Sequence, residues 1–125
     1  MDLLELNQIS NGVLLTDGNH INREIKGACG ADLMSDVLAS IQPNAVLLTG
    51  LCNPQVVRTA LMADVSAIVL VRGKNPPQET INLANAESIP LIKTPYGMYE
   101  LCGRLFRAGL PSLEMPVVGT CDCGD

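Results

Sequence analysis

Aromatic side chains are almost absent from this sequence of 125 residues. They make up 2% of it, with no tryptophan, two tyrosines and one phenylalanine, whereas hydrophobic residues as a whole reach 47%. The core must therefore be built from aliphatic side chains, which suit parallel sheets that are buried on both faces. The length fits one domain with a single hydrophobic core.

Positive charge is scarce as well. Eight lysines and arginines stand against 13 aspartates and glutamates, so the net charge is −5 and the sequence pI is about 4.7. A protein that binds nucleic acid through its phosphates needs a basic face, so this balance argues against a nucleic-acid partner. No apolar run approaches the roughly 20 residues that span a bilayer. The first residues carry acids where a secretory signal carries lysine or arginine. We therefore expect a cytoplasmic protein with no membrane partner.

Catalytic groups are few. The one histidine, His20, follows a turn and is expected to be a solvent-facing loop residue. Ser35 and Cys29 are the candidate nucleophiles of an accessory enzyme of acyl or phosphoryl transfer, but a nucleophile needs an adjacent base. The run Gly50-Leu51-Cys52-Asn53-Pro54 matches neither a Walker loop nor a dinucleotide-binding loop. We expect a protein without catalytic residues, with the accessory enzyme as the alternative.

The five cysteines are an odd number, and without a secretory signal they argue against a disulfide framework. Cys29, Cys52 and Cys102 are expected to be small core or loop residues. Cys121 and Cys123 have the one metal-like spacing, but two thiolates are half of a zinc or iron–sulfur site. Two chains could together supply four such thiols, so a metal- or redox-linked partner protein is a further alternative. We expect an inert C-terminal segment and no metal.

The apolar pattern predicts an α/β fold. Three apolar runs have the length and composition of buried strands: Ala45–Thr49, 67–71 and 89–93. Shorter runs at 13–16 and 24–28 are weaker strand candidates. Helical spacing places helices at 2–9, 32–40, 54–63, 77–87 and after Gly97. Because strands and helices alternate, we predict a three-layer sandwich with a mainly parallel sheet flanked by helices.

Several side chains on these helices carry specific expectations. Asp32 is expected to cap the helix at 32–40 by accepting from its first-turn N–H groups. Tyr96 and Tyr99 flank a turn and either form an interface or cover the sheet edge. The apolar side chains expected to share the inward faces are Leu33, Val37 and Leu38, then Val56, Val57, Ala60, Leu61 and Ala63, and last Leu101, Leu105 and Phe106.

The stretch INREIKGACGADLMSDVLASI, followed by AVLLTGLCNPQVVRTALMADVSAIVLVRGKNPPQETINLANAESIPLIKTPYGMYELCGRL, resembles the DRTGG domain. That domain is similar to the N-terminal domain of HPr kinase/phosphorylase and, more remotely, to a Mur-ligase substrate domain. The literal Asp-Arg-Thr-Gly-Gly string is absent, so the resemblance rests on the overall pattern. Its most telling parts are Gly30-Ala31-Asp32-Leu33-Met34-Ser35-Asp36, Leu70-Val71-Arg72-Gly73, and Ile89-Pro90-Leu91 leading to Thr94 and Tyr99-Glu100.

The resemblance covers about 1–109 and leaves 110–125 as an extended tail. In the family, the domain accompanies nucleotide-sensing CBS pairs, phosphotransacetylases and kinases, and it also stands alone. The resemblance therefore implies a stand-alone, non-catalytic regulatory module that forms a homodimer. It could also engage a protein partner in a metabolic or signalling complex.

Polar and cationic residues follow the three predicted strands. In open α/β sheets, ligands bind beyond the carboxyl ends of the strands. Three of the eight cationic residues, Arg72, Lys74 and Lys93, fall at these ends, and helix N-termini add backbone donors for an anion. Ordinary solvated loop charges are the alternative. We predict a site for a phosphometabolite or adenine nucleotide, with no other cofactor, bounded by Thr49, Gly50, Arg72, Gly73, Lys74 and Thr94.

Overall fold

From residue 27 onward, strands and helices alternate along the chain in the computed structural model, which describes residues 1–18 and 23–116. The elements are α1 (Leu3–Ile9), β1 (Val13–Leu14), β2 (Gly27–Gly30), α2 (Met34–Ser40), β3 (Ala45–Thr49), α3 (Pro54–Met62), β4 (Ala67–Leu70), α4 (Gln78–Ala86), β5 (Leu91–Lys93) and α5 (Met98–Arg107). Among the described residues, no helix has the length and apolar character needed to cross a membrane.

The strands form one mixed, mostly parallel sheet in the order β1-β5-β4-β3-β2. Val46 of β3 lies opposite Ala67 of β4, and Val69 of β4 lies opposite Ile92 of β5. β2, β3, β4 and β5 are parallel to one another, and the short β1 runs antiparallel to β5. The predicted parallel core sheet is therefore confirmed.

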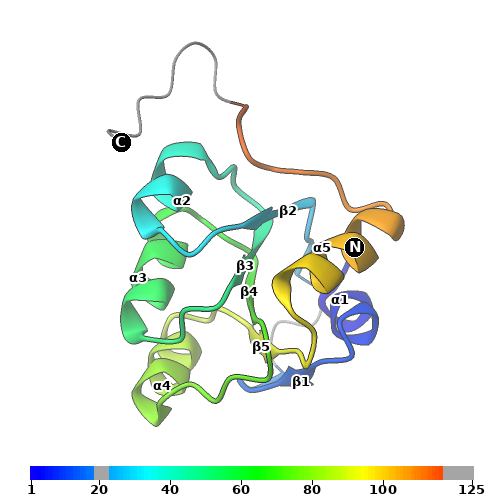
Figure 1. Cartoon of the computed structure of the whole chain (residues 1–125). Coiled ribbons are helices and arrows are strands. Elements are labelled where there is room, and N and C mark those ends of the chain that lie inside the picture. Colours follow the sequence, from blue (N-terminus) through cyan, green and yellow to red (C-terminus); the bar gives the residue numbers. More distant parts are fainter. Residues whose placement is uncertain (19–22, 117–125) are drawn as a thin grey trace.

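Helices cover both faces of this sheet, with α2, α3 and α4 on one side and α1 and α5 on the other (Figure 1). Successive side chains of a strand point to opposite faces, so β3 contributes to both halves of the core. Leu47 packs on the side of α2 to α4, and Leu48 packs on the side of α1 and α5. All five residues of β3 are buried, as expected for a central parallel strand. The predicted three-layer α/β class is confirmed.

Four of the apolar side chains expected to face inward point outward instead. The exposed fractions are 60% for Leu33, 49% for Leu38, 49% for Leu61 and 75% for Phe106. α2 has only seven residues, and it buries Val37 alone. On α5, Leu101 and Leu105 are four residues apart and share the buried face, whereas Phe106 is turned about 100° away from Leu105.

Strand boundaries differ from the expectation where proline or glycine intervenes. β5 begins at Leu91 because Pro90 has no N–H for the sheet, although its carbonyl accepts from Ile68 at 2.9 Å. β2 covers Gly27–Gly30 and not 24–28, because its four residues pair with those of β3. Two glycines give β2 little strand propensity of its own, so pairing decides its position.

The segment 110–116, which we call the strap, lies along the outer edge of β2. The Ala28 amide donates to the Pro111 carbonyl at 2.9 Å, and the Leu113 amide donates to the Ala28 carbonyl at 3.0 Å. The strap then crosses to α2, where the Met115 amide donates to Ser40. The beginning of the expected C-terminal tail thus packs against the sheet and partly pairs its edge.

Candidate functional site

Four loops meet at the carboxyl edge of the sheet, one after each parallel strand. Backbone hydrogen bonds connect two of them directly: Arg72 N–H donates to the Tyr96 carbonyl at 2.8 Å, and Gly73 N–H donates to the Thr94 carbonyl at 2.7 Å. The loop after β2 reaches the loop after β3 through Asp32, which bonds Gly50. The structure therefore brings the predicted site residues to one edge, as the parallel topology requires.

Asp32 is the residue whose role the sequence interpretation missed. Its Oδ1 accepts from the Gly50 amide at 2.8 Å and from the Thr49 hydroxyl at 2.9 Å. The predicted capping role is wrong: the N-cap of α2 is Leu33, and no side-chain bond is made there. The prediction failed because the bonded residues are distant in sequence. An aspartate just before a helix has the same local sequence whether its side chain bonds the helix or a neighbouring loop.

The hydrogen bond from Gly50 is the main reason why the pKa of the Asp32 carboxyl is lowered, and the bond from Thr49 adds to it. Burial raises the pKa by less than either of these two hydrogen bonds lowers it, and the positive charges of Lys74 and Arg72 lower it further. Asp32 therefore carries a full negative charge at neutral pH. The candidate site contains one fixed anion beside two cations.

Gly50 forms the floor between opposite charges. A methyl group placed on Gly50 would lie 3.6 Å from Oδ2 of Asp32 and 3.8 Å from Nζ of Lys74. Nevertheless, among residues 1–18 and 23–116 the one ion pair within 4.0 Å is that of Arg104 with Glu100. The carboxylate and the ammonium thus both lie beside Gly50 without forming an ion pair.

Arg72 has an unusual backbone conformation. Its φ is +64° and that of Gly73 is +62°, so both residues of this tight turn are left-handed. Such a conformation costs a residue with a Cβ roughly 1 kcal/mol, and strain of this kind gathers at functional sites. The Arg72 side chain reaches toward the loop before α5, where its Nε lies 3.9 Å from a methyl placed on Gly97. The other described non-glycine residues with positive φ have short side chains: Asn11, Asn44, Asp64 and Ser88.

Two of the predicted site residues are buried and do not reach the surface. Thr49 and Thr94 are fully buried, and both hydroxyls donate within the protein, to Asp32 and to the Ser10 carbonyl respectively. Lys93 donates to Asn75 Oδ1 at 2.7 Å and so braces the loop after β4. Among the predicted site residues, Arg72 and Lys74 have exposed, charged side chains.

The candidate nucleophile Cys29 is poorly placed for chemistry. Its side chain is 3% exposed and its thiol donates to Glu114 Oε2 at 3.1 Å. Burial first, and then the carboxylate of Glu114, raise the pKa of Cys29 to about 12. Burial also raises the pKa of Cys102. Because the thiolate is the reactive form, Cys29 is a poor nucleophile at neutral pH.

The remaining sequence candidates do not form a site in the described part of the chain. Ser35 is an exposed residue in the first turn of α2. No group of three or more histidine, cysteine or acidic side chains that could hold a metal occurs in residues 1–18 and 23–116. His20, Cys121 and Cys123 lie outside the described residues.

A family model described as "DRTGG domain" matches residues 5–108. A similar solved structure holds the CBS and DRTGG domains of the regulatory region of a Clostridium perfringens pyrophosphatase, complexed with its activator, diadenosine tetraphosphate. The TM-score is 0.65 and the sequence identity 15%, over 88% of this chain and 47% of that chain. The present chain thus spans about half of that regulatory region, and the likeness concerns the fold. Among curated proteins, no relative matches the chain.

Proposed function

The chain belongs to the DRTGG domain family, and on that premise we propose that it is a non-catalytic regulatory module that binds a small phosphorylated ligand at the carboxyl edge of its sheet. The observation that carries this proposal is that two exposed cations lie near Asp32 and lower the pKa of its carboxyl. Nζ of Lys74 lies beside Gly50, and Nε of Arg72 lies beside Gly97. The net charge of the whole chain is −5, so two neighbouring cations at this edge contrast with the negative charge of the chain as a whole.

The chemistry of the two cations favours a phosphate group. The planar guanidinium of Arg72 can make a bidentate contact with phosphate or carboxylate oxygens, and Lys74 adds a more mobile point charge. The Gly50 and Gly73 amides already donate to Asp32 and Thr94, so the side chains and not the backbone would hold the anion. A nucleotide is the class we favour, because the similar pyrophosphatase region is complexed with a nucleotide activator.

Isothermal titration with adenine nucleotides and inorganic pyrophosphate tests this proposal. We expect Arg72→Ala to weaken binding by about 1.5–3 kcal/mol, the range for a hydrogen bond to a charged group. Lys74→Ala should weaken it less. Arg58→Ala, which removes an exposed arginine on α3, is the matched control and should leave affinity unchanged. Because the proposed module is non-catalytic, the nucleotide should also be recovered intact after the titration. An affinity that ignores both site variants, or no binding to any of these probes, would contradict the proposal.

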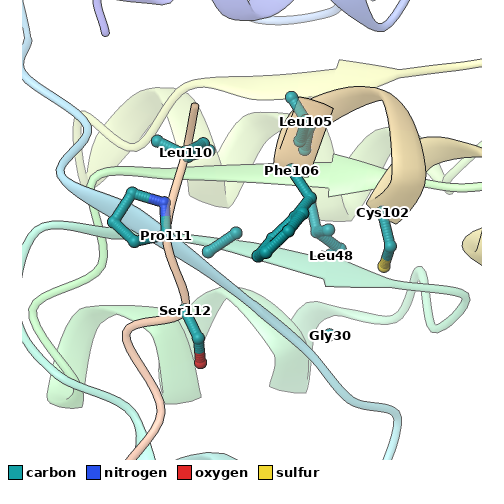
Figure 2. Close-up of a pocket in the computed structure, with 9 residues that line it drawn as sticks. Gly30, Leu48, Cys102, Leu105, Phe106, Leu110, Pro111 and Ser112 are labelled. Carbon is teal, nitrogen blue, oxygen red and sulfur yellow. The ribbon is translucent and has the colours of Figure 1, made fainter. Parts of the chain in front are cut away.

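We also propose that the module forms a homodimer through the outer face of α5. Tyr99 is 94% exposed and Phe106 is 75% exposed, so two of the three aromatic residues in the chain lie on this helix surface. Figure 2 shows Phe106 beside a small apolar groove between α5, β2 and the strap, with a volume of about 140 Å³. Exposed aromatic side chains are typical of the centres of protein interfaces.

A second copy of the chain fits this face because its charges are self-complementary. Tyr99, Gly103 and Phe106 lie along one side of α5, with Glu100 near its start and Arg107 at its end. In an antiparallel pair of α5 helices, each Glu100 approaches the partner helix end that carries arginine. Gly103 has no atom within 4 Å of its Cβ position, so the helices could approach closely there.

Sedimentation at tens of micromolar tests the dimer. Wild type and the control Leu61→Ser, which changes an exposed leucine on α3, should sediment as dimers. The double variant Tyr99→Ser, Phe106→Ser should sediment as a monomer. A monomeric wild type, or a double variant that remains dimeric, would contradict the proposal.

The cytoplasm is the location we propose for this module. Cys29, Cys52 and Cys102 are free thiols, which suits a reducing compartment. Fractionation of producing cells checks this location, and recovery from the secreted fraction would contradict it. A protein partner in a metabolic or signalling complex stays a prediction.

A further inference from the structure

The candidate ligand site contains a carboxylate that a simple anion site would not need. Asp32 is exposed, carries a negative charge, and stands beside Lys74 at the Gly50 floor. A plain phosphate placed there would be repelled by this carboxylate at short range. The site therefore suits a ligand that presents a negative group and hydrogen-bond donors together.

The two oxygens of Asp32 have different roles. Oδ1 is occupied by the Gly50 amide and the Thr49 hydroxyl. Oδ2 accepts no hydrogen bond from the described residues, and it lies 3.6 Å from the methyl position above Gly50. The two bonds to Oδ1 hold the carboxylate in one orientation, so Oδ2 is a fixed, charged acceptor at the floor of the site.

We infer that Asp32 selects a ribose: Oδ2 accepts a hydrogen bond from the ribose 2′-hydroxyl of a ligand whose phosphate is held by Arg72 and Lys74. This inference rests on the proposed function. A phosphorylated ribose combines the needed groups, because its phosphate is anionic and its hydroxyls donate. Carboxylates bind ribose hydroxyls in the same way in dinucleotide-binding folds, where the acid also lies beyond a parallel strand. Inorganic phosphate and pyrophosphate meet the same two cations but lack the sugar donors, so Asp32 only repels them.

Asp32 could instead serve only to tie two loops together. The variant Asp32→Asn separates this structural role from the selection of a ribose. The asparagine carbonyl oxygen can still accept from Gly50 and Thr49, so the tie between the loops is kept. The negative charge and the Oδ2 acceptor are lost. A loop-tying role predicts that all ligands are affected alike, whereas a sugar-selecting role predicts changes of opposite sign for sugar and plain phosphates.

Titration calorimetry with adenosine monophosphate, deoxyadenosine monophosphate and inorganic pyrophosphate decides between them. We expect wild type to prefer the ribonucleotide over the deoxyribonucleotide by roughly tenfold or more, the effect of a hydrogen bond to a charged group. In Asp32→Asn this preference should fall to about twofold or less, while pyrophosphate binds more tightly than to wild type. Asp36→Asn removes the same charge from the first turn of α2 and should preserve the wild-type preference.

Each other outcome has a distinct meaning. If wild type binds both nucleotides equally, or if Asp32→Asn retains the preference, the inference is overturned and the proposed anion site stands. If Asp32→Asn weakens all three ligands in the same proportion, Asp32 is a loop tie only. If wild type binds none of the three, the proposed function and this inference fall together.

Discussion

The ends of β3 and β5 carry the same local motif and use it differently. At each end a fully buried threonine, Thr49 or Thr94, accepts the N–H of the residue two positions later at 3.2 Å. The Thr49 hydroxyl donates to the Asp32 carboxylate, whereas the Thr94 hydroxyl donates to the Ser10 carbonyl. One threonine thus positions a charged group at the candidate site, and the other fastens the end of α1 to the sheet.

The difference lies in what the hydroxyl finds as its acceptor. A backbone carbonyl buried with its donor has no water to replace a lost bond, so the bond matters for stability. A carboxylate at an exposed edge can accept from water if the hydroxyl is lost, so this hydrogen bond matters for the orientation and the charge of the carboxylate more than for stability. Four predictions, from the largest expected effect to the smallest, test this contrast.

Thr94→Val should have the largest effect on stability. It leaves the Ser10 carbonyl and the Tyr96 amide without their threonine partner, and we expect a loss of about 2–3 kcal/mol in the free energy of unfolding. Urea denaturation followed by circular dichroism measures it. A loss below about 0.5 kcal/mol would show that water replaces these bonds, and it would contradict the proposed difference between Thr94 and Thr49.

Thr49→Val leaves the Leu51 amide without its threonine acceptor, as Thr94→Val leaves the Tyr96 amide. It should still cost less, about 1 kcal/mol, because water can reach the exposed Asp32 carboxylate once the hydroxyl is gone. The Gly50 amide still holds Oδ1 in this variant. The same urea titration, run beside that of Thr94→Val, gives the comparison. Equal losses for the two variants would mean that the two threonines have the same role.

Arg72→Gly should raise stability while it abolishes the proposed anion contact. Glycine adopts a φ of +64° without the penalty that arginine meets, so we expect a gain of up to about 1 kcal/mol. Arg72→Ala keeps a Cβ and should show no such gain. Urea denaturation and pyrophosphate titration on the same samples measure both effects. A destabilised Arg72→Gly would show that the arginine is there for stability and not for a ligand.

The pH dependence of stability should show the smallest effect. The pKa of Asp32 is lowered on folding, so its contribution is complete above about pH 4 and is lost as the pH falls through the folded value. Urea midpoints between about pH 5 and pH 2 should therefore fall less steeply in Asp32→Asn than in wild type. Thr94→Val should keep the wild-type slope. Identical slopes in wild type and Asp32→Asn would contradict the lowered pKa.

The sequence predicted those parts of the fold that burial alone decides. β3 and β4 are continuous aliphatic runs, since a central parallel strand is covered on both faces, and their positions follow from that pattern. The position of the candidate site followed from topology, because parallel strands end at one edge. β2 was located less accurately. Its two glycines have low strand propensity, and its position is set by pairing with β3.

The details of the site depend on contacts between distant residues, which local patterns do not contain. Asp32 bonds a loop 18 positions later in the chain, while its local context is that of a helix cap. Phe106 is apolar and follows a buried leucine, so its sequence position gives no sign that it is exposed. The positive φ of Arg72 has one sequence signal, the adjacent Gly73 in a short loop between a strand and a proline pair.

The strap has a consequence for aggregation. An uncovered strand at the edge of a sheet is a template for pairing with another molecule, and short edges or covering segments prevent this. Here β1 closes one edge with two residues, and the strap closes the other at Ala28. A methyl on Gly27 would lie 2.5 Å from Leu113 Cγ and 2.6 Å from the Pro111 carbonyl oxygen, so a side chain there would push the strap away. The missing side chain at position 27 thereby lets the strap lie close against this edge and cover it.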